Sequence, residues 1–252
     1  MPFTEEEAIG LKATAACSVV SEAGAARILS MPEAPESPML NRIVGLGAER
    51  PATEADVDEA LAAMPPGVSF YVSLAPAARP AQLPDWLRAR GLEPGWGWMR
   101  FRRGVENPPP GKTSLRLAEA NGPAERAAFA VVVRESYGLT HAVEPRLASA
   151  PDHGWQCWVA YHGDEPAAAA GLYADGDVAY LGFAGTLIEH RGKGAQTALL
   201  ARRIQRAREL GCQRLVTETG ERKAGRPSNS YRNILRAGFT EVAVTANWLG
   251  RT

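Results

Sequence analysis

The segment "EHRGKGAQTALLARRIQRARELG", residues 189–211, decides the fold, because it places glycines and cations directly before a long helical pattern. Glycine disfavours helix interiors, so Gly192 and Gly194 belong to the turn in front of the helix. Such a turn exposes backbone N–H groups, and the helix adds its own unpaired donors and the positive end of its dipole. The pattern is typical of a phosphate site, to which Arg191 and Lys193 add charge. A solvated loop with two chance cations is the alternative.

The composition restricts the kinds of partner. The chain of 252 residues has 28 Lys and Arg against 28 Asp and Glu, so we expect neither nucleic acid nor a membrane as a partner. The first residues lack the features of a secretory signal, and no apolar run is long enough for a membrane span. The three cysteines have no metal-type or redox-type spacing. We therefore expect reduced, buried thiols, no metal site and a cytoplasmic location.

A proline-rich stretch divides the chain. The sequence "VENPPPGK", residues 105–112, cannot continue a helix or a sheet. We expect it to link two domains, residues 1–104 and residues 113–252.

The second half alternates between strand and helix patterns. Residues 114–120 read as a strand, 122–138 as a helix with Pro123 in its first turn, and 155–187 as three strands. In the helix after the glycine turn, Leu200, Ile204 and Ala207 share one face. The other faces carry Arg202, Arg203, Gln205, Arg206 and Glu209. A strand at 212–219, a short helix at 228–239 and a strand at 241–249 follow.

The first half ends in the same order of elements. We expect strands at 41–47, 68–76 and 95–103 and helices at 53–64 and 83–92, the first of them capped by Thr53. This matched series indicates an internal duplication, with a chance repeat as the alternative. The first copy lacks "RGKGA", and Glu49, Glu54, Asp56 and Asp58 place negative charge where a phosphate would lie. Only the second half should therefore bind a phosphate ligand.

Two well-known phosphate-binding motifs that contain a glycine turn match this sequence poorly. A nucleotide-triphosphate loop needs Ser or Thr after its lysine, whereas Lys193 precedes Gly194. A dinucleotide fingerprint needs a third glycine where Thr197 stands.

A third family fits well. The segment "TLIEHRGKGAQTALL", residues 186–200, resembles the pyrophosphate-binding segment of the GCN5-related N-acetyltransferase (GNAT) superfamily, [Q/R]-x-x-G-x-[G/A]. Arg191 and Gly194 match, whereas Gln196 stands where Gly or Ala is usual. The resemblance covers the second half, and the chain looks like a tandem member with a degenerate first copy. It implies an α/β (α+β) fold of tandem, mixed, mainly antiparallel sheets with flanking helices, and acetyl-CoA as co-substrate.

The resemblance also implies a set of binding residues. The pyrophosphate would lie on the turn made by Arg191, Gly192, Lys193, Gly194, Ala195, Gln196 and Thr197, and the backbone at Thr186 would polarise the thioester carbonyl. We expect the Gln196 side chain to reach solvent, although it could block one amide. Ser230 and Asn233 share a helix face where the superfamily contacts the pantetheine arm. Alternatively, Ser228 or Ser230 caps that helix and Asn233 faces water.

The catalytic residues are less well defined. The tyrosine that often protonates the thiolate is replaced by Ile234, so Tyr231 or water takes its place, or no acid is needed. Glu218, at the end of a strand, is the candidate base, and an ion pair with Arg222 or Lys223 is its alternative role.

Other titratable residues have weaker claims. We expect Glu189 and His190 to be solvated and Tyr180 to lie in the core. His141 and His153 either shape a substrate pocket or lie on the surface.

The expected function is direct transfer of acetyl from acetyl-CoA to the amine of a small molecule, with the first half helping to shape the acceptor site. A non-catalytic acyl-CoA-binding or regulatory module and a protein acetyltransferase are the alternatives. The acceptor pocket would come from residues 137–155, a loop-rich stretch whose specificity follows no sequence rule.

Overall fold

The computed structural model describes residues 5–225 and 229–252 and forms two compact units. Unit 1 comprises residues 1–100 and 243–252, and unit 2 comprises residues 101–242. These bounds differ from the expected domains, because residues 243–252 group with the first half of the chain rather than the second.

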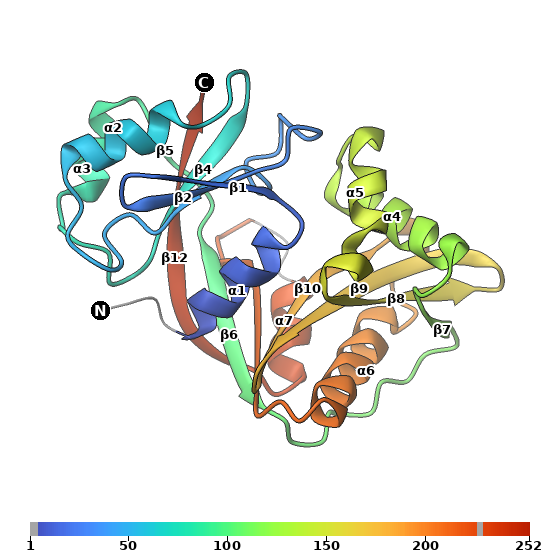
Figure 1. Ribbon diagram of the computed structural model, residues 1–252. Helices are drawn as coiled ribbons and strands as arrows, with labels where there is room; N and C mark the ends of the chain where they lie inside the picture. Colours follow the sequence, from blue (N-terminus) through green and yellow to red (C-terminus); the bar gives the residue numbers. More distant parts are fainter. Residues whose placement is uncertain (1–4, 226–228) are drawn as a thin grey trace. The chain divides into compact units, whose positions relative to one another are not determined.

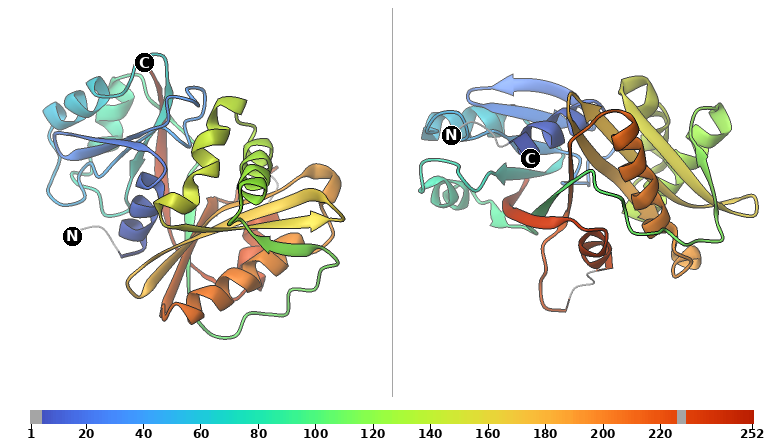
Figure 2. Two further views of the ribbon diagram at one scale, coloured as in Figure 1. Left: turned by 45° about the vertical axis from the view of Figure 1, so that its right-hand side comes forward. Right: turned by 90° about the horizontal axis from the view of Figure 1, so that it is seen from below.

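Unit 2 is a mixed sheet with helices on both faces (Figures 1 and 2). The strand order is β7-β8-β9-β10-β11-β6. The pairs from β7 to β10 are antiparallel, and β10 and β11 are parallel. The strands are β6 (Trp98–Gly104), β7 (Arg116–Glu119), β8 (Trp155–His162), β9 (Glu165–Asp175), β10 (Val178–Thr186) and β11 (Arg214–Gly220).

The helices of unit 2 cover the sheet from both sides. Figure 1 shows α4 with α5 on one face and α6 on the other. Gly122 and Pro123 begin α4, and Gly138, in the left-handed conformation at φ +65°, ends it. The helical segments are α4 (Pro123–Tyr137), η1 (His141–Val143), α5 (Glu144–Ala148), η2 (Ala150–His153), η3 (Ile188–His190), α6 (Ala195–Glu209) and α7 (Asn229–Arg236).

Unit 1 repeats the order of strand directions. Its strands run β1-β2-β3-β4-β12, with antiparallel pairs except for the parallel pair β3 and β4. This matches β8-β9-β10-β11 and supports the duplication. The elements are α1 (Glu5–Ala15), β1 (Val19–Ala23), β2 (Ala26–Ser30), β3 (Arg42–Val44), α2 (Glu54–Ala62), β4 (Ser69–Leu74), α3 (Leu83–Ala89), β5 (Glu93–Pro94), which pairs with β12, and β12 (Thr240–Arg251).

The predicted strands and helices correspond to elements in both units, and Thr53 caps α2 as expected. The sequence reading omitted α1 and the β1–β2 hairpin. The three cysteines are buried and form no disulfide. No helix in the described residues has the length and apolar character that a membrane crossing requires.

Candidate functional site

The parallel strands β10 and β11 pair over only part of their length. Their register runs from Val178↔Arg214 to Leu181↔Thr217, where the Thr217 hydroxyl donates to the Leu181 carbonyl at 2.8 Å. On its other side β10 has a bulge against β9 between Gly182 and Gly185. Within this bulge Phe183 has φ +51°, which is unusual for a bulky residue. The bulge redirects β10 where its pairing with β11 stops, so residues 182–186 present backbone groups that the sheet does not use.

A buried arginine of α6 holds the start of this bulge. Arg203 is 1% exposed, and its guanidinium donates to the Gly182 carbonyl at 3.3 Å, the Gly171 carbonyl at 3.2 Å and the Leu199 carbonyl at 3.1 Å. Burial lowers the pKa of Arg203 to about 10. The sequence places Arg203 outside the apolar face of α6, and the structure shows that its side chain is nevertheless buried. The helix does bury Leu200, Ile204 and Ala207 as predicted.

The glycine turn follows β10 and η3 and leads into α6. Gly192 and Gly194 have φ of +81° and +78°, a region that glycine adopts without strain. Gly194 is the N-cap of α6, and no side chain caps the helix. In the described part of the chain, the backbone N–H groups of residues 192–197 donate to no other group. A cluster of unpaired amides at a helix N-terminus has the chemistry that binds phosphate oxygens.

The two cations of the turn differ in their surroundings. The Lys193 ammonium lies 3.2 Å from Nδ1 of His162 and 3.4 Å from Nδ1 of His190. His190 is 5% exposed, so the expectation that it is solvated is wrong, whereas Glu189 is exposed as expected. Arg191 is exposed, and its backbone N–H donates to the Ile188 carbonyl at 3.2 Å, whereas its guanidinium forms no ion pair with a described residue. Arg191 is therefore the cation of the turn that is available to a ligand.

Gln196 joins the first turn of α6 to the end of β10. Its Nε2 donates to the Gly185 carbonyl at 3.0 Å and to the Thr186 hydroxyl at 2.9 Å. The expectation that this side chain reaches solvent is therefore wrong. The bonds hold the turn beside Thr186, the residue predicted to polarise the thioester carbonyl.

The segment expected to be a linker packs against the same turn. Thr113 donates its hydroxyl proton to the Lys193 carbonyl at 2.7 Å. A Cβ on Gly194 would lie 2.2 Å from the Lys112 carbonyl oxygen, and one on Gly111 would lie 2.6 Å from Cα of Ala198. Only glycine allows these approaches. Sequence reasoning missed this contact, although Gly111 directly after three prolines was a signal for it.

The Tyr231 hydroxyl already has a partner in the fold. It donates to Glu241 at 2.7 Å, and the ring lies edge-on to Phe101 and beneath the Arg222 guanidinium. Burial, and secondly the bond to Glu241, raise the pKa of Tyr231 to about 12. On the same helix Ser230 is exposed and Asn233 is half-buried. Ser228, the alternative cap, lies outside the described residues.

The remaining candidates lie near the strand ends and on the surface. Glu218 is half-buried on β11, just beyond the last residue that pairs with β10, and Lys223 forms an ion pair with Glu221 at 2.9 Å. Tyr180 is buried, as expected. His141 and His153 are exposed, and Nδ1 of His141 lies 3.0 Å from a carboxylate oxygen of Glu144. No three His, Cys, Asp or Glu residues of ranges 5–225 and 229–252 gather as metal ligands.

The bulged strand, the unpaired amides and the uncapped helix N-terminus lie in the region that matches a known protein family. Residues 126–226 match the model of the acetyltransferase (GNAT) family. Unit 2 therefore carries a GNAT acetyltransferase domain. No curated protein sequence matches the chain.

Three solved structures show the same fold over most of the chain. A GCN5-related N-acetyltransferase from Kribbella flavida is 20% identical, with a TM-score of 0.65 over 97% of this chain and 93% of that one. A GCN5-related N-acetyltransferase from Sphaerobacter thermophilus is 15% identical, with a TM-score of 0.62 over 90% and 76%. A tandem GNAT protein from the clavulanic acid biosynthesis pathway is 16% identical, with a TM-score of 0.56 over 90% and 78%. These likenesses establish the fold: mixed α/β, mainly antiparallel, with flanking helices.

Proposed function

We propose that the protein is an acetyl-CoA-dependent N-acetyltransferase that moves an acetyl group directly to the amine of a small molecule. The family of unit 2 supports acyl transfer, and the acceptor and the cofactor residues belong to this proposal. The observation that carries it is the run of unpaired amides at the N-terminus of α6, held beside Thr186 by Gln196.

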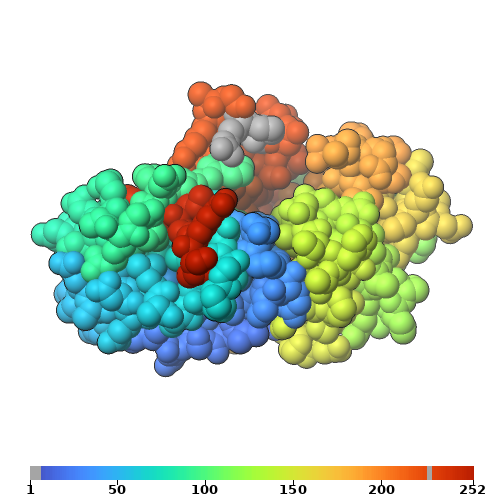
Figure 3. All heavy atoms as spheres, turned by 90° about the horizontal axis from the view of Figure 1, so that it is seen from above, coloured from blue at the N-terminus to red at the C-terminus, as the bar shows by residue number. Residues whose placement is uncertain are grey.

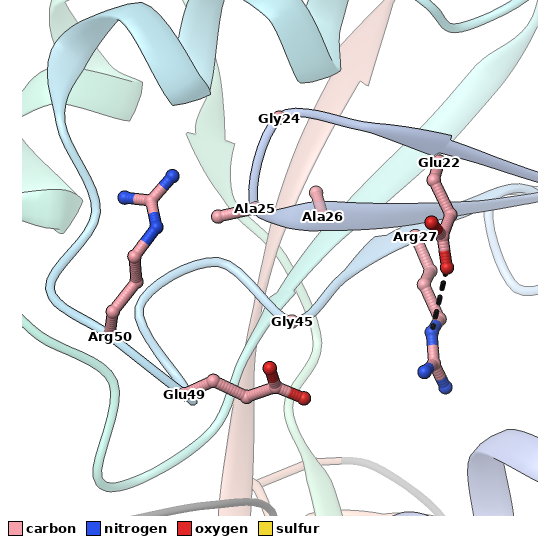
Figure 4. Close-up of a pocket in the computed structure, with 8 residues that line it drawn as sticks. All are labelled: Glu22, Gly24, Ala25, Ala26, Arg27, Gly45, Glu49 and Arg50. Atoms are coloured by element: carbon pink, nitrogen blue, oxygen red, sulfur yellow. Dashed lines mark ion pairs between the residues drawn. The ribbon is translucent and has the colours of Figure 1, made fainter.

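The corresponding helix of unit 1, α2, has an N-terminus whose backbone N–H groups are capped by side chains. In α2 the Asp56 amide donates to the Thr53 hydroxyl at 3.2 Å, and the Thr53 amide donates to the Asp56 carboxylate at 2.8 Å. Arg50 pairs with that carboxylate at 2.6 Å and holds the pKa of Asp56 well below its usual range. The neighbouring pocket is lined by Glu22, Arg27, Glu49 and Arg50, among others (Figure 4). Unit 1 therefore satisfies its helix end internally, and we assign acetyl-CoA to unit 2.

In the proposed reaction, the amides of residues 192–197 and Arg191 hold the pyrophosphate, and the backbone at Thr186 polarises the thioester carbonyl. The amine nitrogen attacks the carbonyl carbon, the C–N bond forms and the C–S bond breaks. Glu218 accepts the proton that the nitrogen loses. The thiolate then takes a proton from water, because the hydroxyl of Tyr231 is engaged with Glu241.

Thiol release from acetyl-CoA, measured over a panel of small amines, tests the function. Release that depends on one amine, with the acetylated amine found by mass spectrometry, is the expected result. Acetyl-CoA binding without turnover over a broad panel would favour the non-catalytic module. Turnover only with protein or peptide acceptors would favour a protein acetyltransferase.

Charge reversal of Arg191 tests the cofactor site. We expect Arg191→Glu to raise the Kd for acetyl-CoA about tenfold or more, because it places a negative charge beside the pyrophosphate. The matched control is Arg27→Glu in unit 1, an exposed cation that should leave the Kd unchanged. Equal affinities of the two variants in calorimetry would reject the assignment.

A further inference from the structure

The second cation of the glycine turn, Lys193, is held by two imidazoles. Its ammonium lies 3.2 Å from Nδ1 of His162 and 3.4 Å from Nδ1 of His190, and the centroids of the two rings are 5.6 Å apart. His162 is the last residue of β8, and His190 is the last residue of η3. Figure 3 shows the segments coloured yellow to orange, which include β8, β9 and β10, side by side at the surface of unit 2. The ammonium therefore ties the turn to β8 and η3.

These contacts define the protonation state of both rings. An ammonium group only donates hydrogen bonds, so each Nδ1 that accepts one carries no proton. Both imidazoles are then neutral, with the proton on Nε2. A proton added to the Nδ1 of either ring removes an acceptor of Lys193 and places a second positive charge beside its ammonium. The contacts that hold Lys193 therefore require unprotonated rings.

Carboxylates lie on the other side of His190. Its Nε2 is 3.9 Å from Oε2 of Glu165, on β9, and 4.0 Å from Oε1 of Glu189, on η3. An imidazolium at this position has these two carboxylates as partners, whereas the ammonium of Lys193 repels it. Within ranges 5–225 and 229–252, these three are the charged side chains that contact the two rings. Histidine changes its charge between about pH 5 and 8, so the arrangement responds to pH in that range.

Protonation changes the charge that the turn offers to a ligand. While both rings are neutral, Lys193 is tied to them and Arg191 is the exposed cation of the turn. A protonated ring releases the ammonium and adds its own positive charge, beside the unpaired amides of residues 192–197. An anion bound at these amides is then attracted more strongly.

We propose that His162, His190 and Lys193 form a proton-sensitive latch, through which acetyl-CoA binding at the glycine turn strengthens as the pH falls. The anionic pyrophosphate stabilises the protonated rings, so the bound protein holds more protons than the free protein. Affinity therefore rises on acidification and is lowest where both rings are neutral. This inference rests on the proposed function and adds a regulation of its cofactor site.

The test compares the Kd of acetyl-CoA at about pH 8 and pH 5.5 by calorimetry. In the natural chain we expect binding about tenfold tighter at the lower pH, because one more cation faces the pyrophosphate. His162→Gln keeps an acceptor for Lys193 that does not titrate, and should reduce this ratio to about threefold or less. The matched control is His153→Gln, an exposed histidine of η2, which should keep the full ratio. The phosphates of the ligand titrate alike in all three proteins, so the comparison isolates the ring.

Several outcomes would overturn the latch. An equal ratio in the natural chain and His162→Gln, an equal reduction in His153→Gln, or tighter binding at the higher pH would each exclude it. If acetyl-CoA binds at neither pH, the proposed function fails separately, and ¹⁵N NMR of the imidazoles at about pH 8 then decides. The latch requires the proton on Nε2 of both rings and Nδ1 resonances that move in Lys193→Met. A proton on either Nδ1, or unmoved resonances, would exclude it.

Discussion

At the scale of single residues, the sequence predicted the chemical role of a residue better than the direction in which its side chain points. Gly192 and Gly194 were assigned to a turn because their conformational preference is intrinsic, and both adopt positive φ. Arg203 was placed outside the apolar helix face from periodicity, and Gln196 was expected to reach solvent. Neither inference takes account of carbonyl groups on a neighbouring strand. Both side chains are long enough to reach such carbonyls, at Gly182 and Gly185 respectively. A bulge that leaves strand carbonyls unpaired depends on tertiary contacts, and no local sequence pattern predicts it.

Tyr231 gives a pH-dependent prediction at this scale. Its pKa is raised to about 12, mainly by burial, whereas an unfolded phenol titrates near 10. The folded protein therefore keeps this proton to higher pH, so the stabilisation is complete below about pH 10 and is lost as the pH rises towards 12. The free energy of unfolding of the natural chain should exceed that of Tyr231→Phe, and this difference should fall by about 1 kcal/mol per pH unit in that window. Urea unfolding at about pH 9, 10 and 11 measures it, and a constant difference would contradict the shifted pKa.

At the scale of elements, the sequence predicted α4, α6 and the strands of unit 2 because each has a clear period and glycine or proline at its ends. Helix α1 was missed since its sequence, "EEEAIGLKATA", shows no continuous apolar stripe. Strand β1 was missed because its first four residues are exposed and carry no alternation. The segment at 105–112 was interpreted correctly as irregular, but its composition could not show that it packs against the start of α6.

That packing makes Thr113 a test of whether the segment belongs to the cofactor site. Thr113→Val removes the hydroxyl that donates to the Lys193 carbonyl and keeps the volume of the side chain. We expect the Kd for acetyl-CoA to rise about three- to tenfold, because the turn loses one of its anchors. Thr240→Val is the control, since it removes a similar bond, to the Arg102 carbonyl at 3.2 Å, elsewhere in unit 2. If both variants bound acetyl-CoA like the natural chain, the segment would be a linker only.

At the scale of the whole molecule, the duplication was readable from the order of elements, but the division of the chain between the units was not. Strand β12 begins in unit 2, and its residues from Ala243 onward belong to unit 1, where Ala246 to Arg251 pair with β4. Strand β6 crosses the boundary in the opposite direction, after Arg100. Strand patterns specify which residues are extended, whereas the choice of partner depends on contacts distant in sequence.

The proline-rich boundary suggests that the second half folds by itself. The division into units predicts that it does not. A chain that begins at Lys112 lacks Phe101, which is fully buried and lies edge-on to Tyr231 with ring centroids 4.8 Å apart. Loss of a buried phenylalanine alone costs about 3–5 kcal/mol, and Arg103, which donates to the carbonyls of Ala237 and Glu106, is lost with it. The shortened chain also keeps residues 243–252 without β4. We expect it to aggregate or to bind acetyl-CoA weakly.

A second shortened chain separates this explanation from a general effect of truncation. Residues 98–242 keep β6 with Phe101 and Arg103, and they end where unit 2 ends. Because the chain then matches a compact unit, it should be more soluble than residues 112–252 and should unfold at a higher temperature. Calorimetric binding of acetyl-CoA and thermal unfolding of the two chains measure the difference. Full solubility and affinity in residues 112–252 would show that neither β6 nor the first half is needed, and that the compact units do not correspond to folding units.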